Sequence, residues 1–464
     1  MMRWRSGSKN PLDRLLARGG SFEGASVKLT VFVHDQAVAT LESPDNFKHV
    51  LAYYPDAPAA LFASLLMPVR TESYAYPELH PLFRMNLPEG FLLSTLQEQL
   101  GPHVGASALN LLSVVGRNAI GRVKVAREGA DPMAPPFSFE LKDILRGDNS
   151  EEAFVALVRR FAASGVSGVV PKFLTPNSIG QAKRGTLSTD RYIIKGTTER
   201  LPGIALNEHF CMKVADRAFG YAAKTEVSDD GQALVVHRFD YVDASDTRLG
   251  MEDLCSLLTL RPEQKYESTW ERVAKRIKEV TVPAGQGPAL SHLGNQLLLT
   301  YALRNADCHT KNIALLYQDR DTVRLAPVYD MLTITAYDDY CKNPPGMPVN
   351  GRSTWSPGKS LALFLQTSCC IGAQEIHTRV ERICEAMVEI SPEVVRAARS
   401  YPCFELIGPR MLHIWNEGMN SLRLQKSWSL PSLNEQITAA GWSDVAKPKL
   451  TLEQKIGRSQ LSPM

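Results

Sequence analysis

The chain has 464 residues, of which 44% are hydrophobic and 22% are charged, with 31 glycines and 29 prolines. This composition is typical of a globular protein and excludes a disordered, collagen-like or coiled-coil chain. Lys and Arg outnumber Asp and Glu by 52 to 49, and this net charge of +3 is too weak to mark a dedicated nucleic-acid coat or membrane-surface protein, although it leaves room for a local basic patch. The length predicts two or three domains.

The eight cysteines all follow residue 210, and none of them forms a C-x-x-C pair. The sequence therefore predicts neither a disulfide framework nor a zinc site. The first 25 residues are rich in arginine but lack the apolar segment of a signal peptide, and no run of 18 apolar residues occurs. We expect a cytoplasmic protein without membrane contact, and a mobile basic N-terminus over residues 1–25.

The first predicted element is a β-hairpin over residues 27–41, where apolar and polar side chains alternate on both sides of a polar turn. Apolar groups at helical spacing follow over 57–112, broken by a proline-rich stretch around Pro68, Pro77 and Pro81, and 121–125 has the pattern of a strand. A segment rich in glycine and proline at 128–136 is a predicted linker. These features predict a small N-terminal α/β domain over residues 26–130.

The remaining chain begins with a predicted amphipathic helix over 150–163, whose acidic first turn complements the helix dipole. Strands are predicted at 191–195 and 234–239, on either side of a helix at 205–219 that Gly220 ends. The second half is mostly helical by hydrophobic period, with two short strands. The helices are predicted at 252–260, 271–280, 289–304, 373–390 and 404–424, and the strands at 313–317 and 323–325.

The stretch from 305 to 312 is the most informative, because it leaves a helix and enters a strand with chemically useful side chains. It contains Asp307 and, five positions later, Asn312, and Asp330 follows beyond a short hairpin. In kinases, three such residues accept the proton of the acceptor hydroxyl, bind Mg²⁺ and hold the metal against the phosphates. The order and spacing therefore predict a phosphoryl-transfer site. Taken alone, the first two residues would also fit an ordinary turn.

Two upstream features strengthen this prediction. Lys195 ends a predicted strand and Glu208 lies in the next helix, as in the kinase ion pair that places a lysine on the nucleotide phosphates. An exposed lysine and a solvated glutamate are the alternative. The glycine- and serine-rich loop at 164–172 precedes this strand, and its backbone N–H groups could approach phosphate oxygens closely. A turn that ends a helix is the alternative for the loop.

Together these motifs resemble the HipA family, the Ser/Thr kinase toxins of bacterial type II toxin–antitoxin pairs. The blocks that carry the resemblance stand in the family's order at 116–123, 167–172, 192–195, 207–208, 237–240, 252–255 with 265–268, 307–312 and 327–330. The resemblance implies an α+β, two-lobed, protein-kinase-like fold related to the phosphatidylinositol kinases. It has a small N-terminal α/β subdomain and a mostly helical C-terminal lobe. The implied boundaries are 140–245 for the N-lobe, 246–445 for the C-lobe and 446–464 for a mobile tail.

The resemblance also implies roles for individual residues. Asp307 would be the catalytic base, and His309 and Lys311 would stabilise transferring charge or shape the loop. Asn312 and Asp330 would hold Mg²⁺. ATP would be bound by Ser167, Gly168, Lys172, Lys195, Glu208 and the backbone around His237 and Phe239.

The chain departs from the family pattern at three positions that bear on ATP binding. The family often has Gln at the position of Val170 and at the position of Met251. It often has an acidic residue at the position of His237. Met251 lacks the polar group with which a glutamine at this position could contact the ribose of ATP. The departures therefore concern ATP binding, whereas the residues that the phosphoryl transfer needs are all present.

The loop that carries the family's autophosphorylation site also differs. Gly165 stands where the family commonly has its modified serine, which leaves Ser167, and after it Ser164, as the predicted sites. A phosphate added there would repel the nucleotide phosphates and expel the loop.

The first functional hypothesis is a Mg-ATP-dependent Ser/Thr protein kinase that arrests growth by phosphorylating a translation component, typically an aminoacyl-tRNA synthetase. The expected partner is a helix-turn-helix antitoxin, through which alone the protein would reach DNA. The second hypothesis is a kinase-shaped corepressor or binding module with weak or no ATP turnover, which the three departures favour. The third is a small-molecule or lipid kinase on the same fold.

Overall fold

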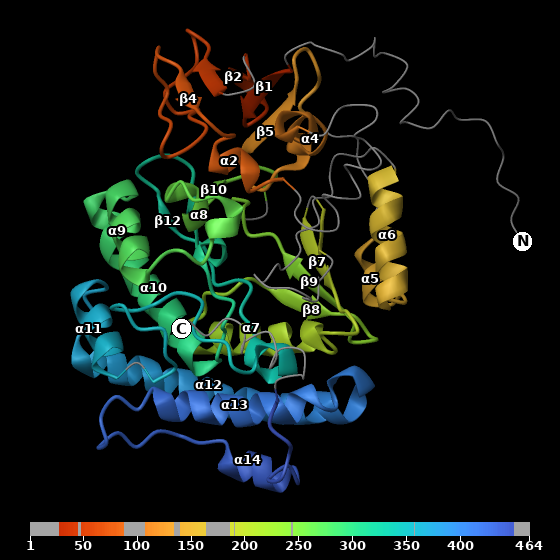
Figure 1. Ribbon diagram of the computed structural model, residues 1–464, viewed down its shortest axis with the longest axis vertical. Coiled ribbons are helices and arrows are strands. Elements are labelled where there is room, and N and C mark those ends of the chain that lie inside the picture. The colour runs from red at the N-terminus through yellow and green to blue at the C-terminus, as the bar shows by residue number, and fades with distance from the viewer. Residues whose placement is uncertain are drawn as a thin grey trace, which may run out of the picture.

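The computed structural model describes residues 27–44, 48–87, 107–133, 140–163, 186–189, 191–242, 245–356 and 358–449. Figure 1 shows an N-terminal sheet at the top, a second sheet with its helices in the middle, and a layer of long helices at the bottom. This mixed architecture agrees with the predicted α+β class. None of the helices in these ranges has the length and apolar character needed to cross a bilayer.

The N-terminal part is built on a five-stranded antiparallel sheet in the order β4-β3-β2-β1-β5. Its strands are β1 (Lys28–Val33), β2 (Gln36–Glu42), β3 (His49–Tyr53), β4 (Tyr74–Tyr76) and β5 (Val123–Arg127). The predicted hairpin is confirmed, and its turn places His34 and Asp35 at positive φ. Leu29, Val31 and Val33 are completely buried on one face of β1, and Thr30 and Phe32 on the other face are buried as well, as in a strand that lies inside a sheet.

The segment between β3 and β5 departs from the helical prediction made for it. Its described helices are the short α2 (Pro81–Arg84) and α4 (Ala108–Val115), whereas residues 54–73 form turns. Pro58 and Pro68 lie in these turns, and proline lacks the backbone N–H that a helix interior requires. Within residues 54–73, apolar spacing alone therefore overestimated the helical content.

The middle part has a four-stranded antiparallel sheet in the order β6-β7-β9-β8. Its strands are β6 (Thr186–Ser188), β7 (Tyr192–Gly196), β8 (Thr225–Val227) and β9 (Ala233–His237). The associated helices are α5 (Leu141–Leu145), α6 (Glu151–Ala163) and α7 (Ile204–Phe219). As predicted, α7 ends at Gly220, which has a φ of 63° that glycine adopts without strain.

The C-terminal part is mostly helical and includes a three-stranded sheet in the order β10-β11-β12. The strands are β10 (Gly250–Asp253), β11 (Ala314–Tyr317) and β12 (Arg324–Leu325). The helices are α8 (Leu254–Leu257), α9 (Trp270–Val280), α10 (Pro283–Ala302), α11 (Lys359–Thr367), α12 (Ala373–Ser400), α13 (Ile407–Ser421) and α14 (Asn434–Ala439). In Figure 1, α12 and α13 form the lower layer, and α12 packs directly on α7.

Two helix predictions in this part were wrong in detail. The helix expected over 252–260 begins as strand β10, because residues 250–253 pair with β11, and only a single turn of helix follows. α12 continues ten residues beyond its predicted end and contains Pro392. Its apolar face continues past that proline with buried Val394, Ala397 and Ala398, and this packing outweighs the lost backbone hydrogen bond.

A buried carboxylate joins the N-terminal sheet to the C-terminal part. Glu252 on β10 is fully buried and accepts hydrogen bonds from Ser64 Oγ at 2.6 Å, Leu65 N at 2.7 Å and Tyr317 Oη at 2.7 Å. Burial raises the pKa of this carboxyl above its ordinary value. Strand β10, which lies partly in a predicted helix, therefore supplies the carboxylate that accepts hydrogen bonds from both the N-terminal and the C-terminal parts.

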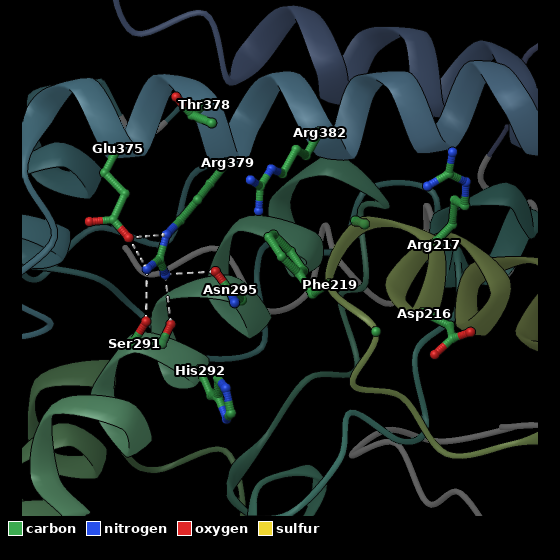
Figure 2. Close-up of a pocket in the computed structure, with 12 residues that line it drawn as sticks. Asp216, Arg217, Phe219, Ser291, His292, Asn295, Glu375, Thr378, Arg379 and Arg382 are labelled. Atoms are coloured by element: carbon green, nitrogen blue, oxygen red, sulfur yellow. Dashed lines mark hydrogen bonds and ion pairs between the residues drawn. The ribbon is translucent and has the colours of Figure 1, made fainter.

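A cavity of about 540 Å³ lies between the end of α7 and helices α10 and α12. Figure 2 shows Arg379 of α12 reaching across to α10, and none of the predicted site residues lines this cavity. The Arg379 guanidinium donates to Ser291 O at 2.9 Å, Ser291 Oγ at 2.7 Å and Asn295 Oδ1 at 2.7 Å, and it pairs with Glu375. These bonds commit Arg379 to holding two helices together.

Replacing Arg379 by Lys is therefore expected to lower the free energy of unfolding by about 1–2 kcal/mol, because lysine cannot reproduce the planar fork of donors. Urea denaturation followed by tryptophan fluorescence measures the change. Arg382→Lys is the matched control, since Arg382 is an exposed arginine of the same helix and the same cavity. Equal losses in both variants would contradict the structural role assigned to Arg379.

Candidate active site

The predicted catalytic loop runs from the end of α10 to the start of β11. Arg304 turns the chain with a left-handed φ of 55°, and Asn305 then fixes the loop from inside. Asn305 Oδ1 accepts from Asp307 N at 3.1 Å, while its Nδ2 donates to Asp330 O at 3.3 Å. Asn305 thus ties the loop that carries Asp307 to the segment that carries Asp330.

The second half of the loop is a single 3₁₀ turn at Thr310–Asn312. Asn312 is buried, and its Nδ2 donates to Asp330 Oδ2 at 2.7 Å. Its backbone carbonyl accepts from Gln296 Nε2 of α10 at 2.9 Å. The structure therefore brings together two residues that are 18 positions apart and that the sequence predicted as metal ligands.

A lysine bridges two carboxylates beside this loop. Lys195 Nζ on β7 lies 2.6 Å from Glu208 Oε1 of α7 and 2.5 Å from Asp330 Oδ1. Glu208 is fully buried, and Asp330 has a left-handed φ of 58°, a conformation that costs a non-glycine residue energy and is concentrated at functional sites. The predicted Lys195–Glu208 pair is thus formed, and it extends to Asp330.

The Asp307 carboxyl lies in a half-buried position where several charges act on it. Burial raises its pKa to about 6, and Asp330 contributes in the same direction. Lys265, a hydrogen bond from Tyr266 and Lys195 act in the opposite direction. A carboxyl with this pKa is mostly ionised at neutral pH and is a stronger base than an ordinary aspartate.

His309 is buried beside this carboxyl, and neither ring nitrogen has a hydrogen-bond partner among the described residues. Burial lowers its pKa well below the ordinary value, and Lys265 and Lys311 add to the effect. The ring is therefore neutral, which favours the predicted loop-shaping role over the stabilisation of transferring charge. Lys311 is half-buried, and its backbone carbonyl accepts from Tyr329 Oη at 2.7 Å.

The predicted adenine hinge is only partly available. The His237 N–H donates to Lys224 O at 2.9 Å, and the imidazole bonds Glu226, so this N–H is committed to the sheet. Phe239 places its ring 5.4 Å from that of Tyr329, immediately before Asp330. Met251 packs in the same apolar cluster as both rings. The hinge is therefore bordered by an apolar wall.

The block at 116–123 in the N-terminal part contacts this hinge. The buried Asp240 pairs with Arg238 and accepts from Gly121 N at 2.7 Å, while Arg248 Nη1 donates to Ala119 O at 3.0 Å. Burial works to raise the pKa of Asp240, but Arg238 and the Gly121 N–H outweigh it and hold the pKa below its ordinary value. The N-terminal part therefore buttresses the chain where it passes from the middle to the C-terminal part.

Several predicted residues cannot be placed. The residues of the glycine- and serine-rich segment that were predicted to bind ATP or to be autophosphorylated lie outside the described residues. They are Ser164, Ser167, Gly168 and Lys172. Gly165 and Val170 lie there as well.

Sequence reasoning also gave no role to Asn305, Lys265, Tyr266 or Tyr329. Lys265, Tyr266 and Tyr329 stand within the motif blocks, and Asn305 opens the stretch from 305 to 312, so their position there was the available signal.

The donor set at Asn312 and Asp330 suits Mg²⁺. Both side chains offer hard oxygen atoms, and Mg²⁺ is usually held by one or two carboxylates together with substrate phosphates. The described residues contain no group of three His, Cys, Asp or Glu side chains that could hold a metal on their own. A carboxylate and an amide oxygen are donors of the kind that Mg²⁺ takes from a protein when substrate phosphates supply its other ligands.

Two family models match the chain. The model described as the HipA N-terminal domain matches residues 29–126, and the model described as the HipA-like C-terminal domain matches residues 164–391. Both matches are in the order in which the sequence motifs occur.

Curated relatives include two proteins of Sinorhizobium fredii (strain NBRC 101917 / NGR234). "Putative kinase Y4mE" is 29% identical over 294 residues, which cover 60% of this chain and 69% of the relative. "Putative kinase Y4dM" is 26% identical over 298 residues, which cover 60% of this chain and 66% of the relative. The chain thus spans about two thirds of the length of these relatives.

A solved structure shares the fold. It is the Shewanella oneidensis MR-1 toxin–antitoxin system of HipA, HipB and operator DNA, with a TM-score of 0.57 and 16% identity. The match covers 85% of this chain and 96% of that chain. The two-lobed, kinase-like fold class predicted from the motifs is thereby confirmed.

Proposed function

The chain belongs to the HipA family, and we propose that it is the Ser/Thr protein kinase toxin of a type II toxin–antitoxin pair. The observation that carries the proposal is the linked cluster of Glu208, Lys195, Asp330 and Asn312 beside Asp307. Four separate chain segments supply these side chains: β7, α7, the loop between α10 and β11, and the segment that follows β12. Each stands in the order that a phosphoryl-transfer site requires.

In the proposed reaction the acceptor hydroxyl of a serine or threonine attacks the γ-phosphorus of ATP. A new O–P bond forms, the bond from the γ-phosphorus to the β–γ bridging oxygen breaks, and ADP leaves with that electron pair. Asp307 takes the hydroxyl proton on its carboxylate, whose pKa of about 6 leaves it ionised at neutral pH. Mg²⁺, when bound, would neutralise phosphate charge.

The remaining residues position the nucleotide. Lys195 would contact the α- and β-phosphates while Glu208 holds its ammonium in place. Asn312 and Asp330 would hold Mg²⁺, and the apolar wall of Phe239 and Tyr329 would border the adenine. Within the loop outside the described residues, Ser167 or Ser164 would be autophosphorylated.

The biological role follows from the family. We propose that the phosphorylated protein is a translation component such as an aminoacyl-tRNA synthetase, and that growth arrest results in the cytoplasm. The related Shewanella oneidensis structure contains HipA together with HipB and operator DNA. A comparable helix-turn-helix antitoxin is the partner proposed for this chain, and it would provide the contact with DNA.

One observation favours the alternative of a binding module with weak ATP turnover. The His237 N–H is committed to Lys224 O, and Met251 gives the hinge an apolar neighbour where a polar one could contact ribose. Adenine recognition would then depend on fewer polar groups. If that alternative holds, the protein is expected to bind ATP weakly although it keeps all the residues that phosphoryl transfer requires.

The direct test incubates the purified protein with γ-labelled ATP, Mg²⁺ and a cell extract, with a matched reaction in excess EDTA. Label is then counted in the protein, lipid and small-molecule fractions. The proposal expects label on serine or threonine of protein, and its loss with EDTA. Label confined to the lipid or small-molecule fraction would replace the protein kinase with another kinase, and no transfer at all would favour the binding module.

A further inference from the structure

A tyrosine outside the catalytic loop contacts the proposed base. Tyr266 lies between the short 3₁₀ turn at Pro262–Gln264 and helix α9, and its hydroxyl donates to Asp307 Oδ1 across 41 residues of sequence. Within the described ranges, the Asp307 carboxylate accepts a single hydrogen bond, the one from Tyr266 to Oδ1, and Oδ2 accepts none. One carboxylate oxygen is therefore held by Tyr266, while the other makes no hydrogen bond within the described ranges.

The neighbouring residue holds the same loop by its backbone. The Lys265 carbonyl accepts from Thr310 N at 3.2 Å and from Thr310 Oγ1 at 2.9 Å. Residues 265–266 therefore contact the catalytic loop at two points three residues apart. Such a double contact fixes the rotation of the loop relative to the segment before α9.

The phenol ring is itself held in place. The His309 ring meets it edge-on at a centroid distance of 4.9 Å, and Lys265 Nζ lies 5.3 Å from its centroid. Burial and the nearby Asp307 raise the Tyr266 pKa well above its ordinary value. The hydroxyl therefore stays protonated and acts as a donor throughout the neutral pH range.

We propose that Tyr266 is a positioning residue that orients the Asp307 carboxylate by binding Oδ1, so that Oδ2 faces the acceptor hydroxyl. This inference rests on the proposed function, because it names the group that aims the base of that reaction. A donor bonded to a carboxylate stabilises the ionised form. The hydroxyl therefore both aims the base and keeps it ionised despite its burial.

The Tyr266→Phe variant tests the idea by removing one oxygen atom. A hydrogen bond to a charged group corresponds to about a 10- to 100-fold effect, so kcat is expected to fall by about that factor while KM for ATP stays unchanged. The acidic limb of the pH–rate profile is expected to move to higher pH, because Lys265 and Lys195 then oppose burial and Asp330 around Asp307 without the hydrogen bond from Tyr266.

Tyr301→Phe is the matched control. Tyr301 is also buried, but its hydroxyl has no hydrogen-bond partner in the described ranges. This variant is expected to retain the wild-type kcat and pH profile. A Tyr266→Phe variant that behaves like Tyr301→Phe overturns the inference while leaving the kinase proposal standing.

A second measurement is independent of activity. A double-mutant cycle of unfolding constants combines Tyr266→Phe with Asp307→Ala, which removes both carboxylate oxygens, at pH 8, where the wild-type carboxylate is ionised. Coupling of about tenfold or more supports the contact even if the wild type transfers no phosphate, a result that would defeat only the proposed function. Coupling of less than about twofold overturns the inference whatever the activity.

Discussion

The Asp307→Asn variant is expected to transfer phosphate at least about a hundredfold more slowly than the wild type, since a general base typically contributes 10²- to 10⁴-fold. Asparagine keeps the shape of the side chain and an oxygen that can accept from Tyr266, but it cannot take the hydroxyl proton. Labelled ATP with a protein substrate, or with the protein itself, measures the loss.

Nucleotide binding should survive this substitution. Lys195 and Glu208, the groups that would hold the phosphates, have no hydrogen bond to Asp307 in the described ranges. Calorimetric titration with a non-hydrolysable ATP analogue is expected to give an unchanged affinity. Asp321→Asn, which changes an exposed aspartate in the turn between β11 and β12, is the matched control and should keep full activity. Equal transfer by wild type and Asp307→Asn would contradict the role of Asp307 as base.

The same variant has a defined effect on stability. The Asp307 carboxyl has a pKa of about 6 in the folded chain, above the 3.8 of an unperturbed aspartate, so the folded chain binds this proton more tightly than the unfolded chain does. The group therefore favours folding at low pH, and this contribution is lost as the pH rises through the window from about 4 to 6. Asn abolishes this dependence, and the variant should be no less stable than the wild type at pH 8.

The Glu252→Ala variant is expected to lower the free energy of unfolding by about 3–5 kcal/mol. It leaves Ser64 Oγ, Leu65 N and Tyr317 Oη without their acceptor, and each buried donor without a partner costs about 1–3 kcal/mol. Because Ser64 and Leu65 belong to the N-terminal part, the loss also weakens its attachment to β10. Urea denaturation followed by tryptophan fluorescence measures the loss.

Two variants bracket this result. Glu252→Gln keeps one acceptor oxygen and the side-chain volume, so its loss is expected to be smaller than that of Glu252→Ala. Glu263→Ala removes an exposed glutamate and should change stability by no more than about 0.5 kcal/mol. A Glu252→Ala chain that unfolds at the same urea concentration as the wild type would show that the contact between the N-terminal part and β10 does not depend on this carboxylate.

The strongest sequence predictions concern residues whose neighbours in the chain carry the signal. Asp307, Asn312 and Asp330 were recognised by their mutual spacing, and Lys195 and Glu208 by their place on a strand and the next helix. The structure places the last four in one chain of contacts. Local pattern was sufficient here because the order of elements in the fold fixes where each of these residues goes.

Local pattern failed where a distant partner decides the structure. Residues 250–253 form a strand because β11 pairs with them, and this tertiary pairing overrides helical apolar spacing. The structure also shows that the His237 N–H donates to Lys224 O, while the adenine-binding role of the backbone around His237 and Phe239 stays a prediction.

The amino-acid sequence thus determined the family, and it predicted the order of the two lobes and the acid, amide and lysine side chains of the candidate site. Only the tertiary structure decided the state of those side chains: that Asp307 has a raised pKa, that His309 is neutral, and that Tyr266 bonds Asp307. The physical reason is that protonation and orientation depend on burial and on charges brought close by folding. Spacing along the chain carries neither quantity.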